Sequence, residues 1–332
     1  MKYSQTFYKK QLNIRLLFAF AILFFTVAFV CSILFGSTKL NLSSLFDGVY
    51  KKIFLYVRLP RTLACMTAGA ALAVSGAMIQ AVLANRLASP SLIGVNAGAG
   101  LSITLCTAFG VFGGWQTPLF SFLGAFGAVV LVAFVSRRFG TSKGTLILMG
   151  VALNSFLNAL SSAVVTLNPD VGVLSNDFKV GDFSAVTYTK LIPAAFLTLL
   201  ALVLAFSLAN MLDVMTLGEE NAAGLGINIH AARTLFLLLA ALLAGAAVSI
   251  AGLLSFVGLV VPHAVRKMGA ATSLHLLPLS ALFGAGFVML CDLAARTAFS
   301  PYEIPVGIVM AFIGAPFFIL LLIKGKGGRN LD

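Results

Sequence analysis

A stripe of polar side chains inside an apolar segment is the group of residues in this sequence best placed to do chemistry. Asn154, Asn158 and Ser162 recur at every fourth position, so they share one face of a helix. Two amides and a hydroxyl can hydrogen-bond to a neighbouring helix, or they can line a path for a polar solute. The spacing supports both interpretations equally.

Groups that would activate a substrate are missing from the sequence. There is no G-x-x-x-x-G-K-[ST] loop to bind nucleotide phosphates, and the glycine-lysine cluster at 325–328 lacks both the leading glycine and the hydroxyl residue. The carboxylates fall in predicted loops or at helix ends, which disfavours proton or sodium coupling. His263 and the four scattered cysteines suit structural packing better than catalysis. We therefore predict a chain that is not an enzyme and has no cofactor or metal site of its own.

The elements that position these residues are membrane helices. The 332 residues are 60% hydrophobic and 10% charged, whereas a soluble domain carries about 25% charged residues. The mean hydropathy is +1.05 over the whole chain. The formal net charge of +12 is better explained by anionic lipid on the cytoplasmic side than by nucleic acid. The composition predicts a single transmembrane domain over residues 1–332, with no nucleic-acid partner.

Uncharged intervals long enough to cross a bilayer set the number of helices. The interval 87–136 is too long for one crossing, and the interval 234–265 fits one long helix or two short ones. Two short helices put more of the 22 basic residues on the cytoplasmic side, so the positive-inside rule favours ten crossings with both termini cytoplasmic. The predicted helices cover about residues 14–36, 61–84, 91–110, 117–136, 144–167, 190–210, 231–250, 252–266, 275–296 and 304–323.

An internal echo is consistent with an inverted repeat. Segments 69–76 and 245–252 share four of eight positions, and they run in opposite directions in the ten-helix arrangement, as such a repeat requires. Small residues also let helices pack closely without any repeat, so both explanations stay open. The predicted fold class is an all-α integral membrane protein with ten transmembrane helices and an inverted internal repeat.

Three arginines lie on the side where the positive-inside rule disfavours them. Arg58 and Arg61 fall in the first outer segment, and Arg296 lies near the outer end of the ninth predicted helix. They can snorkel to lipid headgroups, or they can dock an acidic soluble partner. The topology alone does not separate these interpretations.

Six motifs follow one another along the chain. They are RLPRTL at 58–63, GAALAVSGAMIQ at 69–80, ASPSLIGVN at 88–96, LGEENAAGLG at 217–226, FVGLVVPH at 256–263 and EIPVG at 303–307. In this order and spacing the sequence resembles the FecCD family over about residues 10–323. That family comprises the permease subunits of bacterial ABC importers for ferric siderophores, haem and cobalamin.

The resemblance implies a set of partners and a location. We expect a permease in the bacterial cytoplasmic (inner) membrane that pairs with a second permease subunit, identical or different. Two cytoplasmic ATPase subunits would bind ATP and Mg, and an extracytoplasmic binding protein would deliver a small metal chelate. In the family, positions matching Arg58, Arg61 and Arg296 face acidic residues on the binding protein, so the resemblance favours docking over snorkelling.

The resemblance also implies an ATPase-coupling loop at about residues 213–228. The family folds this loop into short helices that sit in a cleft of the ATPase. Glu219 and Glu220 suit the positive start of a short helix, and Gly224 or Gly226 would stop it. The predicted coupling residues are Asp213, Leu217, Gly218, Glu219, Glu220, Gly224 and Gly226.

Two departures from the family pattern concern the gate and the substrate. The turn after the second helix usually reads Asn-Pro-Leu and helps to form the inner gate, whereas here Arg86 stands between Asn85 and Leu87. The resemblance implies a gate role for Asn85 and Leu87. Segment 178–183 reads FKVGDF and includes Asp182, whereas many relatives have Trp and then Gly-Ser in this external region, so the departure concerns specificity.

The predicted function is the permease subunit of an ABC importer for ferric siderophores. Haem and cobalamin permeases of the same family are the alternatives within the class, and an ion-coupled secondary transporter is the alternative from another class. In this interpretation Asn154, Asn158 and Ser162 line the translocation path, and Asn85 and Leu87 form its gate.

Overall fold

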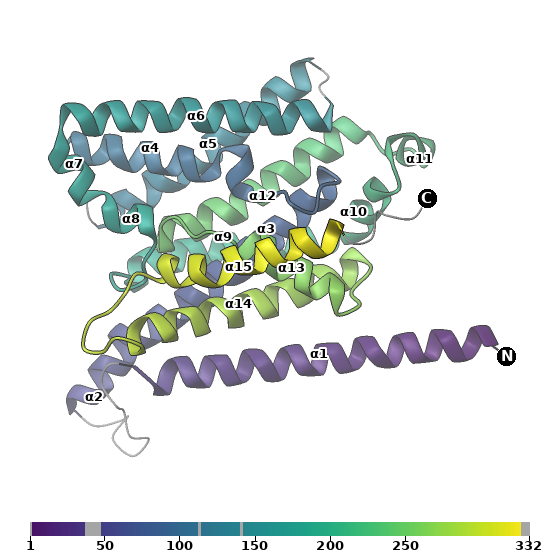
Figure 1. Ribbon diagram of the computed structural model, residues 1–332, viewed down its shortest axis with the longest axis horizontal. Helices are drawn as coiled ribbons and strands as arrows, with labels where there is room; N and C mark the ends of the chain where they lie inside the picture. Colours follow the sequence, from purple (N-terminus) through teal and green to yellow (C-terminus); the bar gives the residue numbers. More distant parts are fainter. Residues whose placement is uncertain (1, 37–47, 112–113, 140–141, 327–332) are drawn as a thin grey trace.

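The computed structural model describes residues 2–36, 48–111, 114–139 and 142–326 (Figure 1). All regular structure within these ranges is helical, so the predicted all-α class is confirmed. The elements are α1 (Lys2–Leu34), α2 (Gly48–Ile53), the π-helix η2 (Phe54–Arg58), α3 (Leu59–Val82), the 3-10 helix η3 (Pro90–Ile93), α4 (Val95–Ala108), α5 (Gln116–Phe139), α6 (Lys143–Leu167), α7 (Pro169–Leu174), α8 (Asn176–Val180), α9 (Tyr188–Ser207), α10 (Ala209–Thr216), α11 (Glu219–Gly224), α12 (Ile229–Ala251), α13 (Val257–Lys267), α14 (Ser273–Thr297) and α15 (Val306–Lys326).

Seven helices of the described chain are long and apolar enough to cross a membrane. They are α1, α3, α5, α6, α9, α12 and α14. Shorter apolar helices lie in α4 and α15, and α13 has 11 residues. A helix therefore lies in each of the ten predicted ranges, whereas ten crossings and the side on which the termini lie stay predictions.

The long helices run roughly side by side, so the bundle has two ends (Figure 1). Helices α2, α7 and α8 lie at one end, which we call the α8 end. The start of α1 lies at the opposite end together with α10 and α11, and we call this the α11 end. In the predicted topology the α8 end is the outer one.

Helix α3 forms the centre of the bundle, and 89% of its membrane-spanning stretch is buried. A Cβ at Gly69 would overlap the carbonyl group of Gly284 on α14, and one at Gly76 would overlap that of Gly258 on α13. The Ser75 hydroxyl donates to the Ala240 carbonyl of α12 at 2.7 Å. Close helix packing explains the small residues of segment 69–76, and the inverted repeat stays a prediction.

Helix α13 begins later than the sequence predicts, at Val257 and not at residue 252. The backbone leaves the helical path at Gly252, where φ is +69°. The next N–H group, on Leu253, donates to the Phe178 carbonyl of α8 at 2.9 Å. Phe256 is also left-handed, with φ +67°. This contact with a distant segment interrupts the helix, so periodicity alone could not place its start.

Candidate functional site

The three predicted docking arginines meet at the α8 end of the bundle. Arg58 ends η2 and Arg61 lies in the first turn of α3, while Arg296 lies in the last turn of α14. Their exposed fractions are 4%, 6% and 3%. The single chain thus places all three guanidinium groups inside the protein, where each contacts groups of this chain. Docking of a partner by these arginines stays a prediction.

Arg61 makes the central contact of this arginine cluster. Its Nε and Nη2 donate to Oδ1 of Asp292 at 3.0 and 2.9 Å, and its Nη1 donates to Oε2 of Glu303 at 2.7 Å. Asp292 is fully buried, whereas the Glu303 side chain is 35% exposed. The planar guanidinium group suits two-point contact with a carboxylate. This geometry joins α3 to α14 and to the segment before α15.

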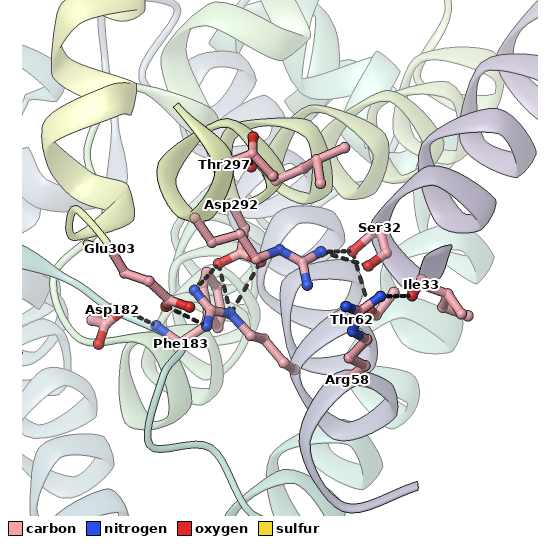
Figure 2. A network of polar contacts seen from close by, with 12 residues as sticks. Ser32, Ile33, Arg58, Thr62, Asp182, Phe183, Asp292, Thr297 and Glu303 are labelled. Carbon is pink, nitrogen blue, oxygen red and sulfur yellow. Dashed lines mark hydrogen bonds and ion pairs between the residues drawn. The ribbon is translucent and has the colours of Figure 1, made fainter. Parts of the chain in front are cut away.

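Arg58 and Arg296 hold the end of α1, and Figure 2 shows Arg58 beside Ile33. Arg58 Nη1 donates to the carbonyls of Ile33 and Leu34 at 2.8 and 2.7 Å. Arg296 Nη2 donates to the carbonyl and the hydroxyl of Ser32 at 2.5 and 3.0 Å. The last carbonyls of a helix have no partner within the helix and carry negative partial charge. Two cations from other helices therefore cap the C-terminal end of α1.

The acidic half of this cluster was not predicted as functional. Asp292 lies four residues before Arg296 on α14, and its Oδ2 is 3.4 Å from Arg296 Nε, an ion pair without a hydrogen bond. The i, i+4 spacing of opposite charges in an apolar helix was a usable signal. Its partner Arg61 is 231 positions away in the sequence, and no local pattern connects the two.

The predicted coupling loop has the expected short helix. Helix α11 begins at Glu219 and ends at Gly224, as predicted. Gly218 and Gly226 flank it with φ of +104° and +79°. Gly226, and not Gly224, therefore has the left-handed conformation that ends a helix. Leu217 before this helix is 59% exposed.

Asp213 connects this loop to the bundle. It lies in α10, and its carboxylate accepts a hydrogen bond from the backbone N–H of Ser273, with distances of 2.8 and 3.0 Å to the two oxygens. Ser273 is the first residue of α14, whose own N-cap residue makes no side-chain cap. The Asp213 carboxylate thus caps α14 from α10. Its negative charge also interacts favourably with the positive end of the α14 dipole.

The polar stripe of α6 divides into a buried and an exposed part. Asn154 is half-buried, and its Nδ2 donates to the Ser91 carbonyl of η3 at 2.8 Å. Asn158 and Ser162 are exposed on the single chain. Asn154 therefore serves internal packing, while the other two remain available to a path or a partner.

The predicted gate residues lie in the turn that follows α3. The Asn85 side-chain oxygen accepts the Leu87 N–H at 2.9 Å, and Ala84 has a positive φ of +48°. Arg86 and Leu87 are exposed. Asn85 therefore shapes this turn, while the gate role of Asn85 and Leu87 stays a prediction. The described residues contain no group of three His, Cys, Asp or Glu side chains that could hold a metal ion.

Seven long apolar helices packed in one bundle define a multi-pass membrane protein. The model of the FecCD transport family matches residues 23–324, and the chain belongs to that family. It is the permease subunit of an ABC importer and is not itself an enzyme.

Relatives with known names are similar over most of the chain. An uncharacterized ABC transporter permease, YvrB of Bacillus subtilis, is 38% identical over 86% of this chain and 83% of its own. The Fe(3+)-citrate import permease YfmD of the same species is 38% identical over 84% of each chain. The vitamin B12 import permease BtuC of Yersinia pseudotuberculosis is 37% identical over 83% of each chain.

The fold also matches a solved structure. A metal-chelate type ABC transporter in an inward-facing conformation superposes with a TM-score of 0.84 at 32% identity, over 93% of this chain and 99% of that one.

Proposed function

We propose that this chain is the permease of an ABC importer that moves a ferric chelate of the siderophore type across the bacterial cytoplasmic membrane. The observation that carries the proposal is the similarity to an Fe(3+)-citrate permease together with a metal-chelate transporter fold. A vitamin B12 permease is nearly as similar, so cobalamin import is the second candidate, with haem import as a further alternative within the family.

The exposed face of α6 supports pairing with a second permease subunit. Only 11% of the membrane-spanning stretch of this helix is buried in the single chain. Phe156 and Leu160 are 60% and 41% exposed, and they lie on the same helix as the exposed polar groups of Asn158 and Ser162. Asn158 lies two positions after Phe156, on the opposite face of the helix. A second subunit against the polar face would enclose Asn158 and Ser162, which suits a path wall between two subunits.

The segment from α10 to α11 supports a contact with the ATPase subunits. Leu217 and Leu225 flank α11 and are 59% and 65% exposed. The segment lies at the end that the topology assigns to the cytoplasm, and Asp213 ties it to α14. Motion of the ATPase would reach α14 through this contact.

The α8 end supports docking of an acidic binding protein through its positive field. Lys51 and Lys52 on α2 are exposed, and they precede Arg58 by less than two helical turns. Exposed lysines steer an acidic partner toward the surface. Arg58, Arg61 and Arg296 then act from within the chain, and Arg58 and Arg296 keep the end of α1 in place.

Transport assays on the assembled importer test the substrate. The chain is co-expressed with its ATPase and binding protein, reconstituted in liposomes, and supplied with ferric citrate, a ferric siderophore, haem or cobalamin. We expect ATP-dependent uptake of a ferric chelate. Uptake of cobalamin alone would replace the ferric assignment, and accumulation without ATP by the chain alone would establish a secondary transporter.

A further inference from the structure

An apolar cavity of about 180 Å³ opens between α5 and α9 at the α8 end. Trp115, Leu119 and Phe122 line it from the α5 side, and Pro193 and Leu197 line it from α9. Trp115 is the single tryptophan of the sequence and is 63% exposed. Tryptophan is enriched where membrane helices leave the hydrocarbon layer, so this cavity lies at the level where lipid headgroups begin.

A second cavity of about 170 Å³ continues the first. Both are lined by Pro118, Lys190 and Ser249. The second adds Asp177 and Asp182. The combined groove is therefore apolar at one end and charged at the other, which is the pattern of an amphipathic ligand.

Among the described residues, the charged side chains of the groove form no ion pairs with one another. Lys190 Nζ donates to the Ala185 carbonyl at 3.2 Å. Asp182 accepts from its neighbours, the Phe183 N–H at 2.7 Å and the Ser184 hydroxyl. Within the described ranges no ion pair joins Lys190 to Asp177 or Asp182, although all three line one cavity. A cation and carboxylates held in this way suit a ligand that carries both signs of charge.

The charged end of the groove is held in place by backbone contacts. The Asp182 N–H donates to the Ala251 carbonyl at the end of α12 at 2.9 Å, and the Leu253 N–H donates to the Phe178 carbonyl at the same distance. These bonds tie the segment that bears both aspartates to the end of α12. The carboxylates are therefore presented by a fixed segment beside Lys190, so a ligand would meet them already positioned.

We propose that this groove binds a phospholipid with a primary ammonium headgroup from the leaflet at the α8 end. The lipid phosphate pairs with Lys190, and the ammonium group pairs with Asp177 and Asp182. One acyl chain lies along Trp115 and Phe122. Phosphatidylglycerol, whose only charge is its phosphate, would satisfy Lys190 but would leave the two carboxylates without a cation, so the groove discriminates between headgroups.

Native mass spectrometry of the full chain in mild detergent tests the site. Phosphatidylethanolamine and phosphatidylglycerol with identical acyl chains are titrated separately. We expect tighter retention of phosphatidylethanolamine, and Lys190→Gln should weaken its binding about three- to ten-fold, which is the range of a charged contact. Asp177→Asn combined with Asp182→Asn should abolish the preference for the ammonium headgroup while retaining phosphate binding.

The control is Lys52→Gln, which removes an exposed lysine at the same end outside the groove. Equal retention of the two lipids by the wild-type chain would overturn the proposal, as would an equal effect of the control. If Lys190→Gln spared lipid retention but weakened association of the binding protein, the groove would be a protein-docking site. If the Lys190 variant failed to fold, the double aspartate variant would decide the same question through loss or persistence of headgroup preference.

Discussion

The Arg61 guanidinium and the Asp292 carboxylate form a two-point ion pair inside the protein, with Nη2 and Oδ1 2.9 Å apart. The pair joins the first turn of α3 to α14 at the α8 end. Glu303 and Arg296 extend it on either side. A buried pair of this kind positions helices because neither charge tolerates the loss of the other.

Removal of Asp292 should strongly destabilise the protein. Asp292→Ala leaves Arg61 buried without its main acceptor, and breaking a buried pair costs about 3–5 kcal/mol. Glu303→Gln is the matched control, because its side chain is 35% exposed and solvent screens its contact. Thermal unfolding in detergent measures both. Equal melting temperatures for the Asp292 and Glu303 variants would contradict this account of the cluster.

Binding-protein docking should depend on charge at the α8 end. Lys51→Gln with Lys52→Gln removes two exposed cations without touching the cap of α1, so association should weaken and its salt dependence should fall. Each exposed contact is worth about 0.2–1 kcal/mol. Arg137→Gln with Arg138→Gln removes two exposed cations from the last turn of α5 and serves as control. Association of the binding protein is measured over a salt series. Equal effects of the lysine and the arginine double substitutions would refute docking at this end.

Asp213 should matter for coupling through its contact with α14. Asp213→Ala removes the cap on Ser273, at a cost of about 0.5–2 kcal/mol. Asp213→Asn retains a side-chain acceptor and should restore most of the lost coupling. The measured quantity is substrate transported per ATP hydrolysed. Equal losses of transport and of ATP hydrolysis in both Asp213 variants, with no rescue by asparagine, would indicate a purely structural role.

Two glycines of the coupling segment, Gly224 and Gly226, should respond differently to substitution. Gly226 has φ +79°, so Gly226→Val forces a β-branched residue into the left-handed region, at a cost of about 1–3 kcal/mol. Gly224 has open space around it and no positive φ, so Gly224→Ala should be nearly silent. Pull-down of the ATPase subunits compares them. Normal ATPase association and transport by the Gly226 variant would show that the segment is an ordinary connector.

Single-cysteine variants should distinguish the exposed positions of the polar stripe of α6 from its half-buried position. In a chain lacking the four native cysteines, Asn158→Cys and Ser162→Cys should react with a water-soluble thiol reagent in the assembled importer in at least one nucleotide state. Asn154→Cys should react slowly, since that side chain is half-buried against η3. Protection of positions 158 and 162 in every state would exclude a water-filled path along this face.

The sequence by itself determined the helical class, the approximate helix positions and the short helix at Glu219. These features follow from uncharged length, charge at helix starts and local glycine positions, all of which act within a few residues. The FecCD motifs are likewise contiguous, so the family could be recognised without coordinates. Local chemistry also marked Arg58, Arg61 and Arg296 as unusual.

Only the tertiary structure decided what those arginines contact, because Arg61 and Asp292 meet through helix packing and not through proximity in the chain. The same holds for Asp213 and Ser273, and for the Phe178 carbonyl that accepts a bond from Leu253 and so delays the start of α13. Asn154 and Asn158 share a helical face in the sequence, yet only one lies against η3. Which side chains become buried depends on where neighbouring helices lie, and one helix's periodicity carries no information about that.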